Sequence, residues 1–134
     1  MSHEAGPTTT VVAGIVRRQG TILICQRRRE AAHALEWEFP GGKLEPGETE
    51  PAGLARELRE ELGIAAEVGK LAARLRHRYP GGEELELAFY EVPSFAGAPQ
   101  NRVFEAIAWV RPSELGRYPF LAADRPLLAR LAKC

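Results

Sequence analysis

The stretch GKLEPGETEPAGLARELREELGI, which covers Gly42–Ile64, runs from a glycine-rich loop into an amphipathic helix. Thr49 is expected to cap the start of the helix, because a threonine hydroxyl can accept a free backbone N–H there. Gly63 supplies the left-handed residue with which helices commonly end. Leucines recur between these ends at a spacing of four residues and predict a buried stripe, namely Leu54, Leu58 and Leu62.

The same helix carries three glutamates, Glu57, Glu60 and Glu61, at the spacing that places side chains on one face. Like charges at this spacing repel one another by a few tenths of a kcal/mol, roughly, for each pair. Arg56 and Arg59 are expected to point largely elsewhere and to relieve this repulsion only in part. A hard divalent cation such as Mg²⁺ would relieve it directly, because Mg²⁺ seeks oxygen ligands. The alternative is an ordinary solvated helix face rich in Glu and Arg.

A longer sequence pattern distinguishes a metal-binding helix face from an ordinary solvated one. Gly42 is followed after five residues by Glu48 and, after seven more, by the run RELREELGI from Arg56 to Ile64. This spacing matches every fixed position of the Nudix box, and the segment WEFPGGK from Trp37 to Lys43 resembles the lead-in of its MutT-like branch. The chain is therefore identified as a member of the Nudix superfamily, close to its MutT-like and CTP-pyrophosphohydrolase-like branches.

The resemblance implies a metal site. Glu57, Glu60 and Glu61 would bind the ion, and the carbonyl of Gly41 would join them. Mg²⁺ is the expected cofactor, with Mn²⁺ as a possible substitute. Lys43 would face the polyphosphate of a substrate as a point charge.

Glu48 precedes the helix and has two possible roles. Its carboxylate is positioned to bond Arg56 and to hold the loop against the helix, which makes Arg56 structural support. In the family this glutamate also binds metal or orients water. Both roles stay open from the sequence.

Composition sets the broad class. The chain has 134 residues, 45% of them apolar, and predicts a single domain over residues 1–134, with residues 1–8 as a loose tail. The formal net charge is zero, so no basic surface indicates nucleic acid or anionic lipid as a partner. Cys25 lies in an apolar run and is expected to be a buried thiol. The absence of a signal peptide or long apolar stretch predicts a cytoplasmic protein without membrane contact.

Alternating apolar residues predict strands over residues 9–17, 21–26, 84–92 and 103–110, with a further one leading to Tyr79. Residues 93–100 read as a loop, and Asp124 is expected to cap a last helix that reaches Ala132. These elements predict an α+β fold. The resemblance implies its arrangement, an α/β/α sandwich with a mixed sheet between the box helix and the C-terminal helix.

Three arginines leave the second predicted strand in a row, from Arg27 to Arg29. They read either as a solvated strand end or as a contact to the nucleotide. MutT-like enzymes use an arginine here, which implies that Arg27 binds the sugar or phosphates. His33 lies in the following loop and is a candidate ligand contact, although an exposed loop histidine is more often idle.

Asp124 is the only aspartate of the chain. Helix capping explains it, but in MutT-like and CTP-pyrophosphohydrolase-like members an Asn or Asp in this stretch lies beside the base. An ionised aspartate only accepts hydrogen bonds, so it favours base edges rich in donors. Guanine and cytosine both offer such donors, and the sequence does not choose between them.

The catalytic base is less defined. Many MutT-like members carry a glutamate six residues before the tryptophan of the late strand, and here that position is Val103. Either the nearby Glu105 takes its place, or a glutamate of the box acts as the general base. The candidates are Glu48, Glu57, Glu60 and Glu105.

The resulting hypothesis is Mg²⁺-dependent hydrolysis of nucleoside triphosphates to nucleoside monophosphate and pyrophosphate. The expected substrates are oxidised or modified purine nucleotides, or cytosine nucleotides, and the expected role is cleaning of the nucleotide pool. The protein would act as a monomer or homodimer. Alternatives are an ADP-ribose or nucleotide-sugar pyrophosphatase, indicated by Pro80, a non-catalytic nucleotide sensor, and a domain that reads damaged DNA bases.

Overall fold

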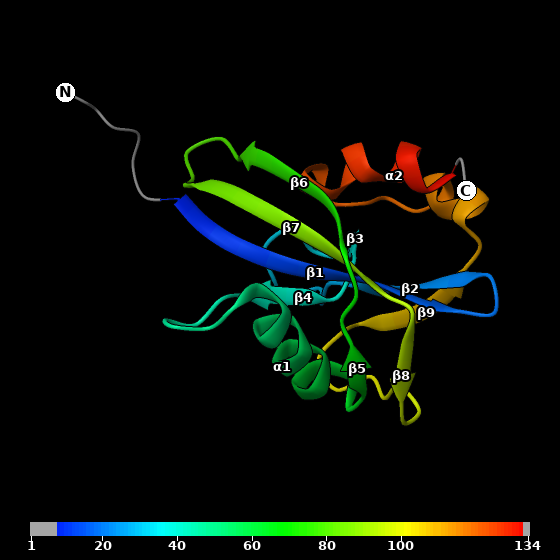
Figure 1. Cartoon of the computed structure of the whole chain (residues 1–134). Coiled ribbons are helices and arrows are strands. Elements are labelled where there is room, and N and C mark those ends of the chain that lie inside the picture. The colour runs from blue at the N-terminus through cyan, green and yellow to red at the C-terminus, as the bar shows by residue number, and fades with distance from the viewer. Residues whose placement is uncertain (1–7, 133–134) are drawn as a thin grey trace.

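The computed structural model describes residues 8–132 (Figure 1). The predicted loose tail, except Thr8, lies outside the described residues, and Thr8 already belongs to the first strand. Both predicted N-terminal strands are present, as β1 (Thr8–Arg18) and β2 (Thr21–Gln26). Two short strands follow, β3 (Trp37–Glu38) and β4 (Gly41–Lys43), and then the box helix α1 (Glu50–Leu62).

The second half of the described chain begins with β5 (Ala65–Glu67), β6 (Leu71–Arg78) and β7 (Glu84–Val92). It continues with β8 (Ser94–Ala96) and β9 (Ala106–Val110). Two 3₁₀ helices, Pro112–Arg117 and Ala122–Asp124, lead into the last helix α2 (Arg125–Ala132).

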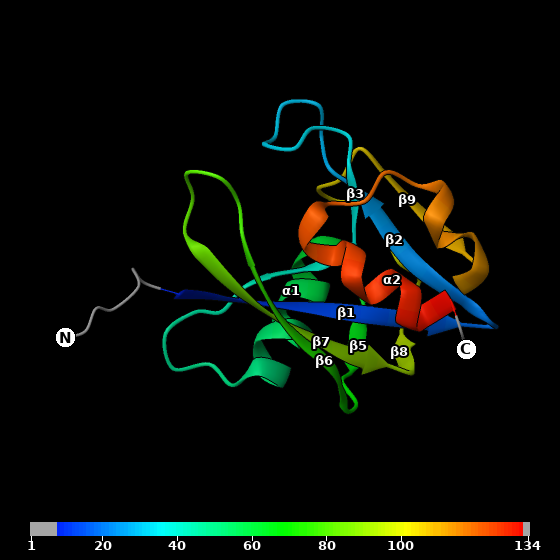
Figure 2. The ribbon, with the colours of Figure 1, turned by 90° about the horizontal axis from the view of Figure 1, so that it is seen from above.

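Strand β1 lies at the centre of the main sheet. It pairs in parallel with β7 and antiparallel with β2 and β4, and β6 adds to the outer edge of β7. Strand β2 also pairs antiparallel with β3 and β9, so the sheet is mixed, as predicted. Strands β5 and β8 form a separate two-stranded sheet beside α1 (Figures 1 and 2).

The two helices cover opposite faces of the sheet, α1 below and α2 above in Figure 1. The buried side chains between α1 and the sheet are called the α1-face cluster. It contains the predicted leucine stripe, Leu54, Leu58 and Leu62, none of which has exposed surface. The α2-face cluster includes Phe39, Phe89, Phe120 and Leu127. Burying a leucine or phenylalanine side chain stabilises a fold by about 1.5–3 kcal/mol, so both faces hold the helices firmly. The predicted α+β fold is confirmed.

Helix α1 begins and ends at the predicted residues. The side chain of Thr49 accepts the N–H of Ala52 at 3.2 Å, which caps the first turn. Gly63 takes the left-handed conformation with φ 71° and donates its N–H to the Arg59 carbonyl at 3.0 Å.

Three local predictions are wrong. The late strand starts at Ala106 instead of Val103, because the side chain of Asn101 bonds both backbone groups of Phe104 and holds a turn there. The predicted loop over residues 93–100 contains strand β8, which is ordered by pairing with β5. Asp124 lies in a 3₁₀ turn before α2, and its carboxylate accepts the N–H of Phe39 at 3.2 Å rather than capping the helix.

Candidate active site

A cavity of about 510 Å³ opens between the sheet, the loop after β2 and the turn before α2. Glu61 of the box helix and the glycine turn of β4 line one part of its wall. Asp124, Phe39 and Tyr79 line another part, and apolar side chains from β1 and β7 form the floor. The fold therefore joins box residues and the predicted base reader in one cavity, although they are far apart in the sequence.

Glu57 and Glu61 converge beside the glycine turn. A methyl group added at Gly42 would lie 2.5 Å from the Glu57 carboxyl, so glycine is needed for this close approach. One oxygen of Glu61, Oε1, is buried and has no hydrogen-bond partner. Burial, then a hydrogen bond with Glu57 and the charges of Glu57 and Glu38, raise the pKa of Glu61 to about 9, although a hydrogen bond from the Gly41 backbone opposes this.

A divalent cation fits this corner of the cavity. Glu61 Oε1 is buried, has no hydrogen-bond partner and lies beside a second carboxylate, so no positive charge balances the pair. A hard cation bound there would supply that charge. Within residues 8–132, however, no three acidic, histidine or cysteine side chains are already gathered around one point. Glu60 explains the difference, because its side chain is 55% exposed and bonds Arg56. The structure thus brings together two of the three predicted metal-binding glutamates.

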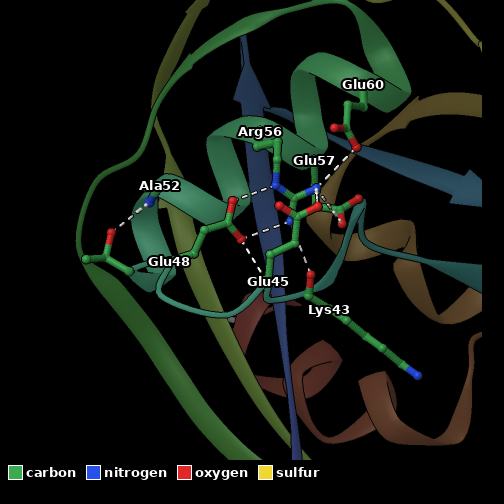
Figure 3. A network of polar contacts seen from close by, with 8 residues as sticks. Lys43, Glu45, Glu48, Ala52, Arg56, Glu57 and Glu60 are labelled. Atoms are coloured by element: carbon green, nitrogen blue, oxygen red, sulfur yellow. Dashed lines mark hydrogen bonds and ion pairs between the residues drawn. The ribbon is translucent and has the colours of Figure 1, made fainter.

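Arg56 lies among carboxylates, and the expectation that it points elsewhere is wrong (Figure 3). Its Nε and Nη2 bond the two oxygens of Glu48 at 2.5 and 3.0 Å, and Nη2 also donates to the Lys43 carbonyl at 3.2 Å. Its Nη1 lies 3.3 Å from Glu57 and 3.2 Å from Glu60. One guanidinium therefore connects the loop after β4 to the box glutamates.

The surroundings of Glu48 favour a structural role. Besides its two bonds with Arg56, it accepts the backbone N–H of Glu45 at 2.9 Å. These bonds, with that to Arg56 the larger cause, lower the pKa of Glu48 to about 2. A carboxylate stabilised so strongly in its charged form is a weak proton acceptor at neutral pH, so the predicted contact is present and a role as base is disfavoured.

Asp124 comes from the turn before α2, also lines the cavity and is 4% exposed. Burial raises its pKa to about 7, against the bond from the Phe39 N–H; the charge of Glu38 adds to the rise and that of Arg27 opposes it. The carboxylate therefore has one oxygen engaged by the backbone and sits on the cavity wall, where a ligand can reach it.

The remaining predicted binding residues also line the cavity. Arg27 donates through Nε to the Ala32 carbonyl at 2.7 Å and through Nη1 to Glu38 at 3.2 Å. His33 is exposed, and its ring lies tilted against that of Tyr79, with centroids 4.5 Å apart and an interplanar angle of 40°. The Lys43 side chain points away from the Arg56 network, as Figure 3 shows.

Glu105 is not brought to this cavity. It precedes β9 and forms an ion pair with Arg29 at 2.9 Å, and the hydrogen bond with Arg29 lowers the pKa of Glu105. The irregular chain before Ala106 directs it to the loop after β2 instead of toward Glu57 and Glu61.

Sequence reasoning missed two residues of the wall, Glu38 and Tyr79. Glu38 stands inside the quoted WEFPGGK segment, and its place on β3 next to β2 offered a signal. Tyr79 precedes the turn Pro80-Gly81-Gly82, where composition predicts only a hairpin end, so no local pattern indicates its contact with the turn before α2.

Comparison with known proteins agrees with this geometry. The NUDIX domain family matches residues 7–131. The CTP pyrophosphohydrolase of Escherichia coli K12 is 45% identical over 88% of this chain and 87% of its own length. A putative 8-oxo-dGTP diphosphatase 2 of Mycobacterium tuberculosis is 42% identical over 92% of this chain and 87% of its own. The crystal structure of a MutT Nudix hydrolase from Burkholderia pseudomallei superposes with a TM-score of 0.83 at 30% identity, covering 92% of this chain and 97% of the other.

The fold and the carboxylate-lined cavity define a hydrolase, and the chain belongs to the Nudix family. It is a Nudix hydrolase of the group that contains these pyrophosphohydrolases, which confirms the predictions of family and of enzymatic activity. Nudix hydrolases generally need divalent metal ions. No helix described over residues 8–132 combines the length and apolarity needed to cross a membrane.

Proposed function

We propose that this hydrolase cleaves nucleoside triphosphates to nucleoside monophosphate and pyrophosphate in the presence of Mg²⁺, with modified purine or cytosine nucleotides as substrates. One observation carries the proposal. A single cavity of about 510 Å³ is lined both by the box residue Glu61 and by the buried acceptor Asp124. A ligand that carries a polyphosphate at one end and a base at the other matches this arrangement.

The relatives support a nucleotide substrate. Proteins named CTP pyrophosphohydrolase and 8-oxo-dGTP diphosphatase share 45% and 32% identity with this chain over about nine-tenths of its length. In the proposal, the chain works in the cytoplasm on free nucleotides, as a monomer or homodimer, and removes damaged nucleotides from the precursor pool.

Several residues of the chain have defined roles in this reaction. Glu57 and Glu61, with the Gly41 carbonyl, would hold Mg²⁺, and Glu60 would join them on leaving Arg56. When bound, Mg²⁺ neutralises phosphate oxygens and lowers the pKa of a water molecule. Lys43 and Arg27 on the cavity wall stabilise charge on the phosphates. Glu57 or Glu60 accepts the proton of the attacking water, since bonds with arginines lower the pKa of Glu48 and of Glu105 and make both weak proton acceptors.

Asp124 selects the base. Because one of its oxygens accepts the Phe39 N–H, further accepting capacity is left for a ligand. The ionised form accepts donors of the base edge, such as the exocyclic amino group of cytosine or the N1–H and amino group of guanine. Such a hydrogen bond is stronger in a buried site, where water does not compete for the donor and the acceptor.

The proposal is tested by following pyrophosphate and phosphate release with Mg²⁺ over 8-oxo-dGTP, dGTP, CTP, dCTP, 5-substituted dCTP, dTTP and ADP-ribose. We expect pyrophosphate as the product and preference for a triphosphate with donors on its base edge, lost in Asp124→Ala. Preference for ADP-ribose with triphosphates ignored would overturn the substrate assignment. Omission of Mg²⁺, with chelator present, should abolish release and be reversed by Mg²⁺ or Mn²⁺.

A further inference from the structure

Tyr79 lines the cavity and contacts several segments of the chain. It follows β6 directly, yet its hydroxyl accepts the backbone N–H of Ala123 at 3.1 Å, next to Asp124. Its ring lies against His33, from the loop after β2, and against His77, with centroids 4.5 and 4.4 Å apart. Three segments that are distant in the sequence thus meet on one side chain that lines the cavity.

The hydroxyl of Tyr79 has a donor to offer. A phenol oxygen that accepts an N–H keeps its own hydrogen for a second bond. Burial, with smaller effects from the charges of Asp124 and Glu36, raises the pKa of Tyr79 against the opposing Ala123 bond, so the hydroxyl stays protonated at neutral pH. Because it bonds the residue next to Asp124, this donor stands close to the acceptor that Asp124 presents.

The loop against the ring holds a strained conformation. His33 and Leu35 both adopt positive φ angles, 56° and 66°, which are unfavourable for residues with large side chains. Strain of this kind persists where surrounding contacts over-determine the backbone. The ring contact of His33 with Tyr79 is one such contact, and it keeps the loop over the cavity.

From these contacts we propose that Tyr79 determines base specificity: its hydroxyl donates to an acceptor on the base edge beside the donor that Asp124 reads, and its ring closes the mouth of the site together with His33. The pair would then recognise an edge on which a donor and an acceptor are neighbours. Cytosine, with its amino group next to N3, and guanine, with N1–H next to O6, both present such an edge. This inference extends the proposed function and rests on its assignment of the base end.

Tyr79→Phe tests the hydroxyl, because it retains the ring. The matched control is Tyr118→Phe, since Tyr118 is also half-buried and packs edge-on against Trp37 outside the cavity lining. Binding of CMP and of 3-deaza-CMP, which lacks the ring acceptor, is measured by calorimetry with Mg²⁺. For a guanine-preferring enzyme, the pair is 8-oxo-dGMP and its 6-thio analogue, which keeps N1–H and replaces the carbonyl oxygen with a weak acceptor. KM and kcat for the matching triphosphates are measured in parallel.

We expect Tyr79→Phe to weaken binding of the natural monophosphate about fivefold to tenfold, as loss of one buried hydrogen bond predicts, and to leave the analogue unaffected. KM should rise by a similar factor while kcat stays within about twofold, and Tyr118→Phe should match wild type. Equal binding of both ligands by wild type and Tyr79→Phe, with hydrolysis intact, would overturn this inference alone. Tyr79-dependent binding without any hydrolysis would overturn the proposed function alone.

Tyr79→Ala tests the ring. It should shorten the lifetime of the bound monophosphate and make the bond after Arg28 or Arg29 in the strained loop more accessible to trypsin, since His33 loses its ring contact. Loop cleavage unchanged from wild type would contradict the closing role of the ring. Circular dichroism, expected to be unchanged, checks that the variant keeps its fold.

Discussion

Glu57 and Glu105 carry the same carboxylate in different surroundings. Glu57 faces the glycine turn and Glu61, whereas Glu105 is paired with Arg29 away from the cavity. We predict that Glu57→Gln lowers kcat by about 100-fold or more, because the neutral amide is a poor ligand for a hard cation, while nucleotide binding persists. Glu105→Gln should retain most of the activity. Pyrophosphate release and calorimetric titration measure both, and a reversed order would make Glu105 the base.

Asp124 gives a pH-dependent prediction. Its pKa in the folded protein is about 7, above the ordinary value of 3.8, so between these values the native state holds a proton that the unfolded chain has lost. Stability of the wild type therefore falls as pH rises from about 4 to about 7, and is constant above that interval. The Asp124→Asn substitution removes this pH-dependent loss of stability, and the asparagine carbonyl can still accept the Phe39 N–H.

Between pH 5 and 8, the variant should accordingly gain on the order of 2 kcal/mol relative to wild type. Urea unfolding of both proteins across this range measures the difference. Glu38 and Arg27, the charged groups near Asp124, are common to both proteins, so the comparison isolates the aspartate. A difference independent of pH would show that Asp124 is ionised throughout.

At the residue scale, the sequence predicted the box side chains better than their partners. Spacing in one helix determines which residues share a face, so the approach of Glu57 to Glu61 followed from it. The contact of Glu48 with Arg56 was also predicted and is present. The spacing did not reveal that Arg56 would bond Glu60 as well and draw it away from the other two glutamates, because that depends on where the loop before the helix folds. Tyr79 and Glu38 were missed for the same reason, since tertiary contacts alone bring them to the cavity.

At the element scale, the packing of β4 against α1 depends on two adjacent glycines with different neighbours. A methyl group at Gly41 would lie 1.9 Å from the Val12 carbonyl oxygen, a backbone atom that cannot yield. At Gly42, the nearest atoms belong to the flexible Glu57 carboxyl. The first glycine is therefore required for folding, whereas the second is required for the position of the Glu57 carboxyl.

We predict that Gly42→Ala keeps the fold and lowers kcat/KM by about 100-fold, because a displacement of about 1 Å at a catalytic group costs that much. Thermal unfolding should change little. Gly116→Ala is the matched control, since an added methyl group meets nothing within 4 Å there. Full activity of Gly42→Ala would mean that Glu57 can act from a shifted position, and a fall in stability like that expected of Gly41→Ala would assign Gly42 to folding.

The elements themselves were largely predictable. Strand β7 and helix α1 have strong alternation or capping signals, and their bounds agree with prediction. Strand β8 and the start of β9 were not predictable, because three-residue strands and turns held by one asparagine side chain depend on their partners. The overall arrangement came from the family resemblance, and the mixed sheet bears it out.

At the scale of the whole molecule, each face of the sheet contains one tryptophan. Trp37 packs on the α2-face cluster and Trp109 on the α1-face cluster. If the chain is one domain, we predict that both faces unfold together. In each of the variants Trp37→Phe and Trp109→Phe, the fluorescence of the remaining tryptophan reports the unfolding of one face. The midpoint of urea unfolding followed by this fluorescence should coincide with the midpoint followed by circular dichroism. Separate midpoints within either variant would divide the protein into two units.

The parallel pairing of β1 with β7 has a consequence during synthesis. Thr8 pairs with Glu84 and Val16 with Val92, so β1 leaves the ribosome about 76 residues before its partner in each pair is made. Until then, one edge of β1 exposes apolar residues and unpaired backbone groups, a state prone to association. Pairing over so long a separation also slows folding. Nascent chains that stop before β7 should therefore be the ones that chaperones bind during synthesis.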